Sequence, residues 1–352
     1  MKHVPLFYKQ KPIFGIDIGH STVKVVQVAQ HKKQPQTIGY GYAEFDPNAI
    51  EDGVIVDPDA VKKSLRPLLE NVVIGELTTD RVVASIPMVY IYSRIVELEG
   101  IEEADLSEAI ELEAQQYVPL DSEEIYLDYM VLERTEEAKT RIFMVAAPKT
   151  IVDSYMALFT DLSLEVYGME PSLLSIIRAI NYTNEGETPK IAIDFGSQSS
   201  DLAIYDGSLR LTSTASAGGD HITECIMETL QVDREEAQRI KTRYGISKSE
   251  WQEQLAPALT PILTTLANEV QKMLRYHHER NDTEADIEQV VIVGGGANLP
   301  GLDNFISRLT GIPVSTSDPW ENLNVKPLQP PHRLETTLYT TAVGLALREL
   351  ER

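Results

Sequence analysis

Apolar strands flank a short polar turn at two places along the chain. GIDIGHSTVKVVQV at residues 15–28 and AIDFGSQSSDLAIY at residues 192–205 each combine an apolar strand, an Asp-x-Gly turn and a second strand. The two motifs lie about half of the 352-residue chain apart. A hairpin repeated at this spacing predicts two related α/β halves, each opening with a β-hairpin.

The segment between the two motifs has the pattern of a small α+β insert in the first half. Strand-like stretches at 81–93, 125–132 and 141–147 flank an amphipathic helix at 105–117. The apolar stripe of that helix consists of Leu106, Ile110, Ala114 and Tyr117. Asp105 and Glu108 resemble a capping box and Pro119 ends the helix, so the insert is expected to fold around this helix.

The second half is predicted to end in helices on either side of a buried strand. A long helix is indicated by apolar residues at helical spacing, namely Ile262, Leu266, Val270, Met273 and Leu274. VVIVGGG at residues 290–296 predicts a buried strand that runs into a glycine turn. The Pro-rich residues 326–333 predict a loop, and residues 337–350 a closing helix.

The charge balance narrows the classes of partner. The chain has 54 acidic and 31 basic side chains and a formal net charge of -23, which argues against binding to nucleic acid. Its single cysteine, Cys225, excludes an intrachain disulfide and fits a reducing compartment. No stretch has the pattern of a signal peptide or a membrane-spanning helix, so a cytoplasmic multidomain protein is expected.

The first Asp-x-Gly turn contains the groups that a nucleotide site needs. Asp17 can face a metal ion, and Gly19 lets the turn approach a phosphate closely. Lys24, on the returning strand, can reach the same phosphates. Further amides and hydroxyls for phosphate oxygens come from His20, Ser21 and Thr22.

The second turn repeats this chemistry, with Asp194 as the carboxylate and Gly196 in the turn. The following polar residues are Ser197, Gln198 and Ser199. A single turn of this kind is usually an ordinary hairpin, whereas two facing turns can grip a polyphosphate from both sides. After the later strand, a flat purine or its ribose can pack on the backbone of Gly294, Gly295 and Gly296. The P-loop sequence GxxxxGK[ST] is absent, which argues against a P-loop enzyme.

In this order, the two phosphate turns and the glycine turn resemble the superfamily of actins, heat-shock chaperones and sugar kinases. Within it, the chain resembles the PilM family of type IV pilus assembly proteins over nearly its whole length. The stretches that carry this resemblance include FGIDIGHSTVKVVQV, EAQQYVPL, IDFGSQSSDLAIYDG and IVGGGANLPGL. The resemblance implies an α/β, actin-like (ribonuclease H-like) duplicated fold with a small α+β insert subdomain like that of the cell-division protein FtsA.

The resemblance also implies four structural units. The first actin-like core would comprise residues 1–80 and 168–186, with the insert at 81–167. The second core would comprise residues 187–227 and 287–352, with a helical subdomain at 228–286.

For the site, the resemblance implies ATP or ADP bound with Mg²⁺. Asp17 and Asp194 would flank the metal, and Lys24 would contact phosphate. Beyond the turn residues and the three glycines, the nucleotide contacts would be Gly218, Gly219, Gln238, Lys241 and Asn298. The family often has Ala-Glu-x-x-Lys where this chain has Ala-Gln-x-x-Lys at 237–241, and Gln238 can still hydrogen-bond a ribose hydroxyl.

Two further carboxylates are implied as catalytic. Glu170 takes the place of the residue that positions the attacking water in bacterial actins. Asp201 takes the position on the second hairpin that Lys24 has on the first. Two plainer interpretations stay open: Glu170, before Pro171, can start a helix, and Asp201 can be a surface residue.

The resemblance implies a nucleotide-binding scaffold of the type IV pilus inner-membrane platform, with at most slow ATPase activity. Its partners would be the cytoplasmic N-terminal tail of PilN and other platform proteins, which would hold it at the inner membrane. Two alternatives are an FtsA-like membrane-associated filament protein and a small-molecule kinase. Whether the chain forms a homo-oligomer stays open.

Overall fold

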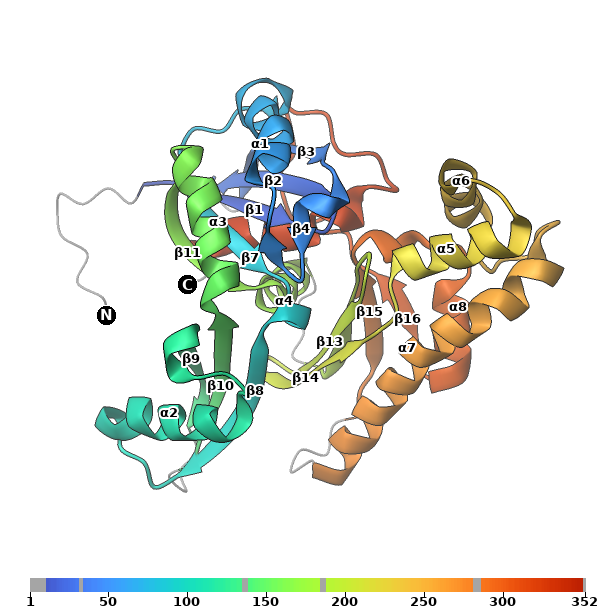
Figure 1. The fold of residues 1–352 in the computed structure, drawn as a ribbon. Helices are drawn as coiled ribbons and strands as arrows, with labels where there is room; N and C mark the ends of the chain where they lie inside the picture. Colours follow the sequence, from blue (N-terminus) through green and yellow to red (C-terminus); the bar gives the residue numbers. More distant parts are fainter. Residues whose placement is uncertain (1–10, 32–33, 135–138, 184–187, 281–285, 351–352) are drawn as a thin grey trace.

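Two lobes face each other across a cleft, and a smaller subdomain extends from the first lobe (Figure 1). The computed structural model describes residues 11–31, 34–134, 139–183, 188–280 and 286–350, so the first ten residues of the expected first core lie outside this description. Both ends of the described chain lie at the first lobe (Figure 1).

The first lobe is built on a six-stranded sheet of order β11-β7-β1-β2-β3-β6. Its strands are β1 Phe14–Ile18, β2 Thr22–Ala29, β3 Gln36–Glu44, β6 Ile74–Gly75, β7 Arg81–Ile86 and β11 Glu165–Pro171. β1, β7 and β11 are parallel neighbours, whereas β1, β2 and β3 form an antiparallel meander. A small hairpin of β4 Ile50–Glu51 and β5 Val54–Ile55 packs beside this sheet.

The sheet of the second lobe repeats this topology in the order β14-β13-β12-β15-β16. Its strands are β12 Lys190–Phe195, β13 Ser200–Tyr205, β14 Leu209–Ala215, β15 Gln289–Val293 and β16 Val314–Thr316. Again three antiparallel strands are followed by two parallel ones. The predicted hairpins are confirmed as β1-β2 and β12-β13, and the shared strand order confirms the duplication.

The insert is a three-stranded antiparallel sheet covered by one helix. Its strands are β8 Tyr92–Glu99, β9 Ile125–Arg134 and β10 Lys139–Pro148, and its helix is α2 Leu106–Tyr117. Leu106, Ile110 and Ala114 of α2 pack on this sheet in a separate hydrophobic core, as the apolar stripe predicts. The capping box at Asp105 is wrong: this side chain makes no capping hydrogen bond, because its backbone is already helical. A capping box occurs instead at Asp121 and Glu124.

The edges of the insert differ from the range 81–167. Strand β7 pairs with β1 and β11, so it belongs to the main sheet of the first lobe. Helix α3, Lys149–Asp161, buries Ile151 and Leu158 in the core of the first lobe. The apolar sequence of β7 predicts a buried strand, but it does not reveal with which strands β7 pairs. We propose that the insert comprises residues 92–148.

The remaining helices surround the two main sheets (Figure 1). They are α1 Pro58–Pro67, α4 Ser172–Thr183, α5 Gly219–Leu230, α6 Arg234–Tyr244, α7 Gln252–Arg280, α8 Leu302–Thr310 and α9 Thr340–Leu347. Of these, α6 packs on helix α5 and not on a sheet. Single helical turns lie at Pro47–Ala49, Leu68–Val72, Met88–Tyr90, Glu103–Asp105, Ser122–Glu124, Gly295–Asn298 and Thr336–Tyr339. The predicted long helix is confirmed as α7, whereas the closing helix is shorter than expected because its first residues form one of these turns.

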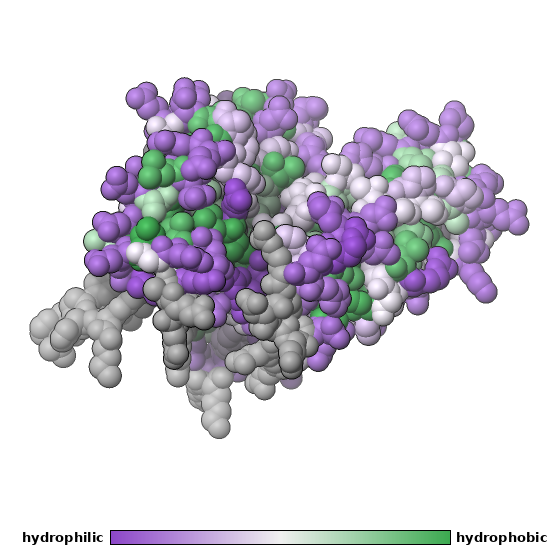
Figure 2. Space-filling view, turned by 90° about the horizontal axis from the view of Figure 1, so that it is seen from below, coloured by the Kyte–Doolittle hydropathy of each residue, from purple (hydrophilic) through white to green (hydrophobic). Residues whose placement is uncertain are grey.

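Polar side chains cover most of the surface that is visible from below, and apolar ones form small separate groups there (Figure 2). Within the described part of the chain, no helix combines the length and apolarity that crossing a bilayer requires.

Helices α4 and α9 cross between the two sheets and join the lobes. Ile176 and Ile180 of α4 pack against the second sheet, whereas α9 lies against β1 and β2 of the first. At the crossing, a Cβ on Gly344 would lie 1.8 Å from the carbonyl oxygen of Ser175. Any side chain larger than hydrogen at residue 344 would therefore push the helices apart.

We predict that Gly344→Ala destabilises the protein by about 2 kcal/mol or more, as overpacking does in a rigid core. In a helix without this contact, the same change would stabilise by up to about 1 kcal/mol. Urea unfolding followed by circular dichroism measures the difference. A variant as stable as the original chain would show that the crossing can relax.

Candidate functional site

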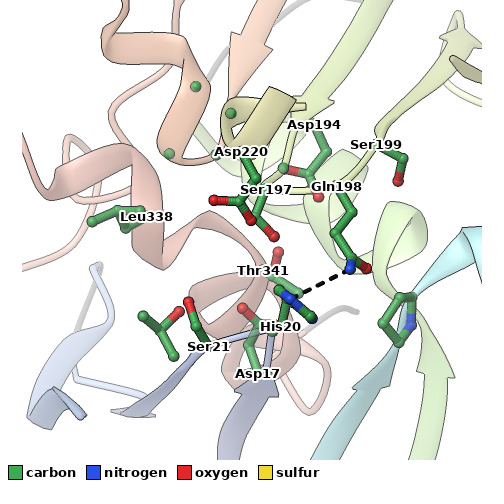
Figure 3. A pocket seen from close by; sticks show the side chains of 18 of the residues that line it. Asp17, His20, Ser21, Asp194, Ser197, Gln198, Ser199, Asp220, Leu338 and Thr341 are labelled. Carbon is green, nitrogen blue, oxygen red and sulfur yellow. Dashed lines mark hydrogen bonds between the residues drawn. The ribbon is translucent and has the colours of Figure 1, made fainter. Parts of the chain in front are cut away.

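A cavity of about 450 Å³ lies between the lobes and is lined by both Asp-x-Gly turns. Figure 3 shows Asp17, His20 and Ser21 approaching it from the first lobe and Asp194, Ser197 and Gln198 from the second. The glycine turn after β15 and helix α6 also contribute to the lining. The sequence-predicted groups thus meet in one place although they come from four distant segments.

In the first hairpin, strand pairing places Asp17 directly opposite Lys24. The ammonium of Lys24 lies 3.2 Å from Asp17 Oδ2, and the turn is closed by a 2.8 Å bond from the Gly19 amide to the Thr22 carbonyl. The hydroxyl of Ser85, on β7, donates to Asp17 Oδ1 at 2.7 Å. Ser85 was not among the predicted site residues; its one sequence signal is a polar position within the apolar run of β7.

The second hairpin has the same register, with Asp194 opposite Asp201. The turn is closed by a 3.0 Å bond from the Gly196 amide to the Ser199 carbonyl. Asp201 lines the cavity and accepts a 2.7 Å hydrogen bond from the Thr214 hydroxyl, so it is not a surface residue. A carboxylate therefore stands where the first hairpin has an ammonium group.

The electrostatics of the cavity favour a bound cation. Burial raises the pKa of Asp194 to about 7, and the negative charges of Asp201 and Asp17 add to the effect, although Lys24 opposes it and part of Asp194 faces the cavity. Burial also raises the pKa of Asp201 to about 6. Carboxylate oxygens are hard ligands, and Mg²⁺ is commonly held by one or two of them together with phosphate oxygens. The pair Asp17 and Asp194 fits this donor set.

Helices α5 and α6 of the second lobe form another part of the cavity lining. The ammonium of Lys241, on α6, donates to the Gly219 carbonyl at 3.0 Å and to the Thr223 hydroxyl at 2.8 Å. Burial lowers the pKa of Lys241 to about 8, so this ammonium is held at the expense of its hydration. Gln238 lies one helical turn before it and accepts a 3.2 Å hydrogen bond from Thr223. Gln238 and Lys241 thus both line the cavity with polar groups.

The glycine turn after β15 is shaped by close contacts. Gly294 has φ +82°, and a Cβ on it would lie 2.4 Å from Asp194 Oδ1. A Cβ on Gly296 would lie 2.4 Å from the ring of Phe195. The side-chain amide of Asn298 donates a hydrogen bond to the Leu334 carbonyl at 2.8 Å, which ties the turn to the segment before α9. Beside this turn, the cavity is lined by the apolar residues Leu299, Leu334 and Leu338.

Two predicted site residues lie outside the cavity lining. Gly218 packs behind the second turn, where a Cβ would lie 2.3 Å from the Ser197 carbonyl oxygen. Glu170 is buried in a bidentate ion pair with Arg178, at 2.5 and 3.2 Å, and its second oxygen lies 3.3 Å from Arg348. This arrangement ties β11 to helix α4 and to the end of α9, and it does not support a water-positioning role for Glu170.

The two repeated sheets around a cleft define the class: this is the actin-like ATPase fold. A solved structure of MreB 5 of Spiroplasma citri bound to AMPPNP matches with a TM-score of 0.56 and 13% identity, covering 97% of each chain. The solved PilM-PilN type IV pilus biogenesis complex matches with a TM-score of 0.83 and 21% identity, covering 98% of this chain and 100% of that one. The predicted fold class is confirmed.

The sequence places the chain within that class. The family model described as type IV pilus assembly protein PilM matches residues 15–350, and the chain belongs to this family. The cell division protein FtsA of Neisseria meningitidis serogroup B is 20% identical, over 96% of this chain and 90% of that protein. FtsA of Enterococcus hirae is 22% identical, over 85% and 76%.

We predict that Asp194→Asn stabilises the nucleotide-free protein, and more so at pH 8 than at pH 5. The pKa of Asp194 is raised to about 7 in the folded state, against about 3.9 when unfolded. The native carboxyl therefore keeps its proton at pH 5 and bears a poorly solvated charge at pH 8. The contribution of this carboxyl to the free energy of unfolding therefore falls by about 1 to 3 kcal/mol as the pH rises from 5 to 8.

Thermal unfolding of both proteins across this pH range is the measurement. A difference in melting temperature that does not grow with pH would contradict the raised pKa.

Proposed function

We propose that this chain is a nucleotide-binding scaffold of the type IV pilus inner-membrane platform, located in the cytoplasm and held at the membrane through its partners. Family membership supports the pilus assignment. The observation that carries nucleotide binding is the pair of Asp-x-Gly turns facing each other across one cavity. Such turns offer backbone amides and carboxylates to a metal-bound polyphosphate.

The bound ligand would be ATP or ADP with Mg²⁺. Asp17 and Asp194 would hold the metal ion, whose charge would neutralise the cavity carboxylates and the phosphates. Lys24 and the amides of both turns would bind phosphate oxygens, with hydroxyls from Ser21, Thr22, Ser197 and Ser199. Gln238 and Lys241 would contact the ribose, and the base would pack on the glycine turn at 294–296.

The site favours holding the nucleotide over rapid turnover. Glu170 is engaged by two arginines, and of the two predicted catalytic carboxylates only Asp201 lines the cavity. Burial raises the pKa of Asp201 to about 6, so this carboxylate is mostly ionised at neutral pH and is the one cavity carboxylate of the predicted pair that would support a slow hydrolysis. A scaffold needs a persistent bound state, and we propose that hydrolysis is slow at most.

The partner is the cytoplasmic N-terminal tail of PilN, and other platform proteins would join the assembly. The similar solved complex is one of PilM with PilN. On this chain, β9 is an edge strand of the insert, so one side of its backbone is open to pair with an extended peptide. Tyr126 and Met130 are exposed on the same face of β9, and the hydroxyl of Tyr126 donates to Asp153 of α3 at 3.0 Å. We propose that the docking groove lies between the insert and α3, on the strength of these exposed side chains.

The sequence similarity to FtsA supports a second candidate, a filament-forming protein at the membrane. The two candidates differ in their response to the PilN tail, because a filament protein of the FtsA kind has no need to bind it.

We predict that Asp17→Asn and Asp194→Asn each weaken binding of Mg-ADP at least tenfold, since each removes a charge next to the metal ion. Isothermal titration with Mg²⁺, and again with chelator, measures the effect. Asp303→Asn, at an exposed position of α8, is the matched control. Unchanged affinity in both cavity variants would refute this metal site.

We predict that Met130→Lys weakens binding of the PilN tail peptide from the same organism about tenfold or more, because it removes an apolar contact and adds a charge. Leu112→Lys, also exposed on the insert but on α2, should bind normally. Fluorescence anisotropy of a labelled peptide gives both affinities. Equal loss in the two variants, or none in either, would place the groove elsewhere.

A further inference from the structure

Three side chains form a hydrogen-bonded chain across the rim of the cavity. The hydroxyl of Tyr90 donates to Gln198 Oε1 at 2.8 Å, and Gln198 Nε2 lies 3.4 Å from His20 Nε2 (Figure 3 shows the second contact). His20 belongs to the turn of the first hairpin and Gln198 to that of the second. Both contacts are solvent-exposed, so they span the rim and not the floor of the cavity.

The ring of Tyr90 packs closely against the first lobe. It ends the helical turn after β7 and precedes β8. Its ring packs on the tip of the β4-β5 hairpin, where Gly53 has φ +81° and a Cβ would lie 2.6 Å from the ring. A fixed hydroxyl loses little conformational freedom when it binds, so the contact to Gln198 ties the second phosphate turn to a firm point.

Gln198 is the shared member of this chain. Its carbonyl oxygen accepts a hydrogen bond from Tyr90, and its amide nitrogen contacts His20. Both polar atoms of this side chain are therefore engaged by the first lobe. The α4-α9 crossing joins the lobes through buried helix packing, whereas this chain of hydrogen bonds joins them at the exposed rim. Opening of the cleft at the phosphate end therefore requires both contacts to break.

We propose that Tyr90 is a positioning residue that latches the cleft closed through Gln198 and slows the release of bound nucleotide. The latch rests on the proposed nucleotide-binding function, because its effect is exerted on that ligand. The proposal gives a role to the turn Met88–Tyr90, which connects β7 of the first lobe to β8 of the insert.

Tyr90→Phe removes the hydroxyl and keeps the ring on Gly53. Stopped-flow dissociation of a fluorescent ADP should become about fivefold faster, the factor that one net hydrogen bond of ordinary strength gives. Tyr92→Phe is the matched control, because its hydroxyl makes no hydrogen bond to the described part of the chain. That control should release ADP at the original rate.

A second measurement needs no nucleotide. Amide hydrogen exchange of the turns at 19–22 and 196–199 should be faster in Tyr90→Phe than in the unchanged protein. In a Gln198→Leu background, Tyr90→Phe should have no further effect on exchange, since the latch is already broken.

Unchanged exchange together with unchanged ADP release would overturn the latch while nucleotide binding stands. Faster release without faster exchange would also overturn it, because Tyr90 would then contact the nucleotide directly. If the unchanged protein fails to bind ADP but its turns exchange faster in Tyr90→Phe, the proposed nucleotide-binding function fails and the closing contact itself is upheld.

Discussion

The contact between Gly344 of α9 and the Ser175 carbonyl of α4 is the constraint on which the arrangement of the molecule depends. Helix α9 also lies tightly on Gly15 of β1, where a Cβ would be 2.3 Å from the Ala342 carbonyl oxygen. Because β1 ends at the turn of Asp17 and α4 packs behind the strand of Asp194, the crossing sets how the two carboxylates face each other. Packing one helical turn beyond the lining residues Ser172 and Thr341 thus sets how the two carboxylates are placed across the cavity.

The cavity itself works against folding. Burial and the negative charges of Asp201 and Asp17 raise the pKa of Asp194, whereas Lys24, which forms an ion pair with Asp17, opposes this effect. A bound divalent cation would relieve that repulsion, so the free energy of metal-nucleotide binding would include the recovery of stability that the empty site lacks. Nucleotide binding and lobe closure are for this reason expected to be coupled.

The parts of the structure that local sequence determines were predictable. Both hairpins, the strand before the glycines and helix α7 follow from alternation or helical spacing, and nearly all proposed nucleotide contacts line the cavity. The parts that depend on distant pairing were not. Strand β7 looks like any buried strand until β1 and β11 appear beside it, and Glu170 looks available until Arg348, from the far end of the chain, reaches it.

Strand β7 and the residues that follow it connect the two proposed activities over a short stretch of chain. Ser85 on β7 hydrogen-bonds Asp17, and Tyr90 hydrogen-bonds Gln198. Strand β8 then begins at Tyr92 and pairs with β10, which in turn pairs with the edge strand β9. A movement of this segment at the cavity would therefore move the insert as well. The two are connected by the continuous backbone from β7 to β8 and by the pairing of the strands in the insert sheet. Partner docking on β9 and nucleotide retention by Tyr90 would act on the same rigid element, and linkage would make any influence between them reciprocal.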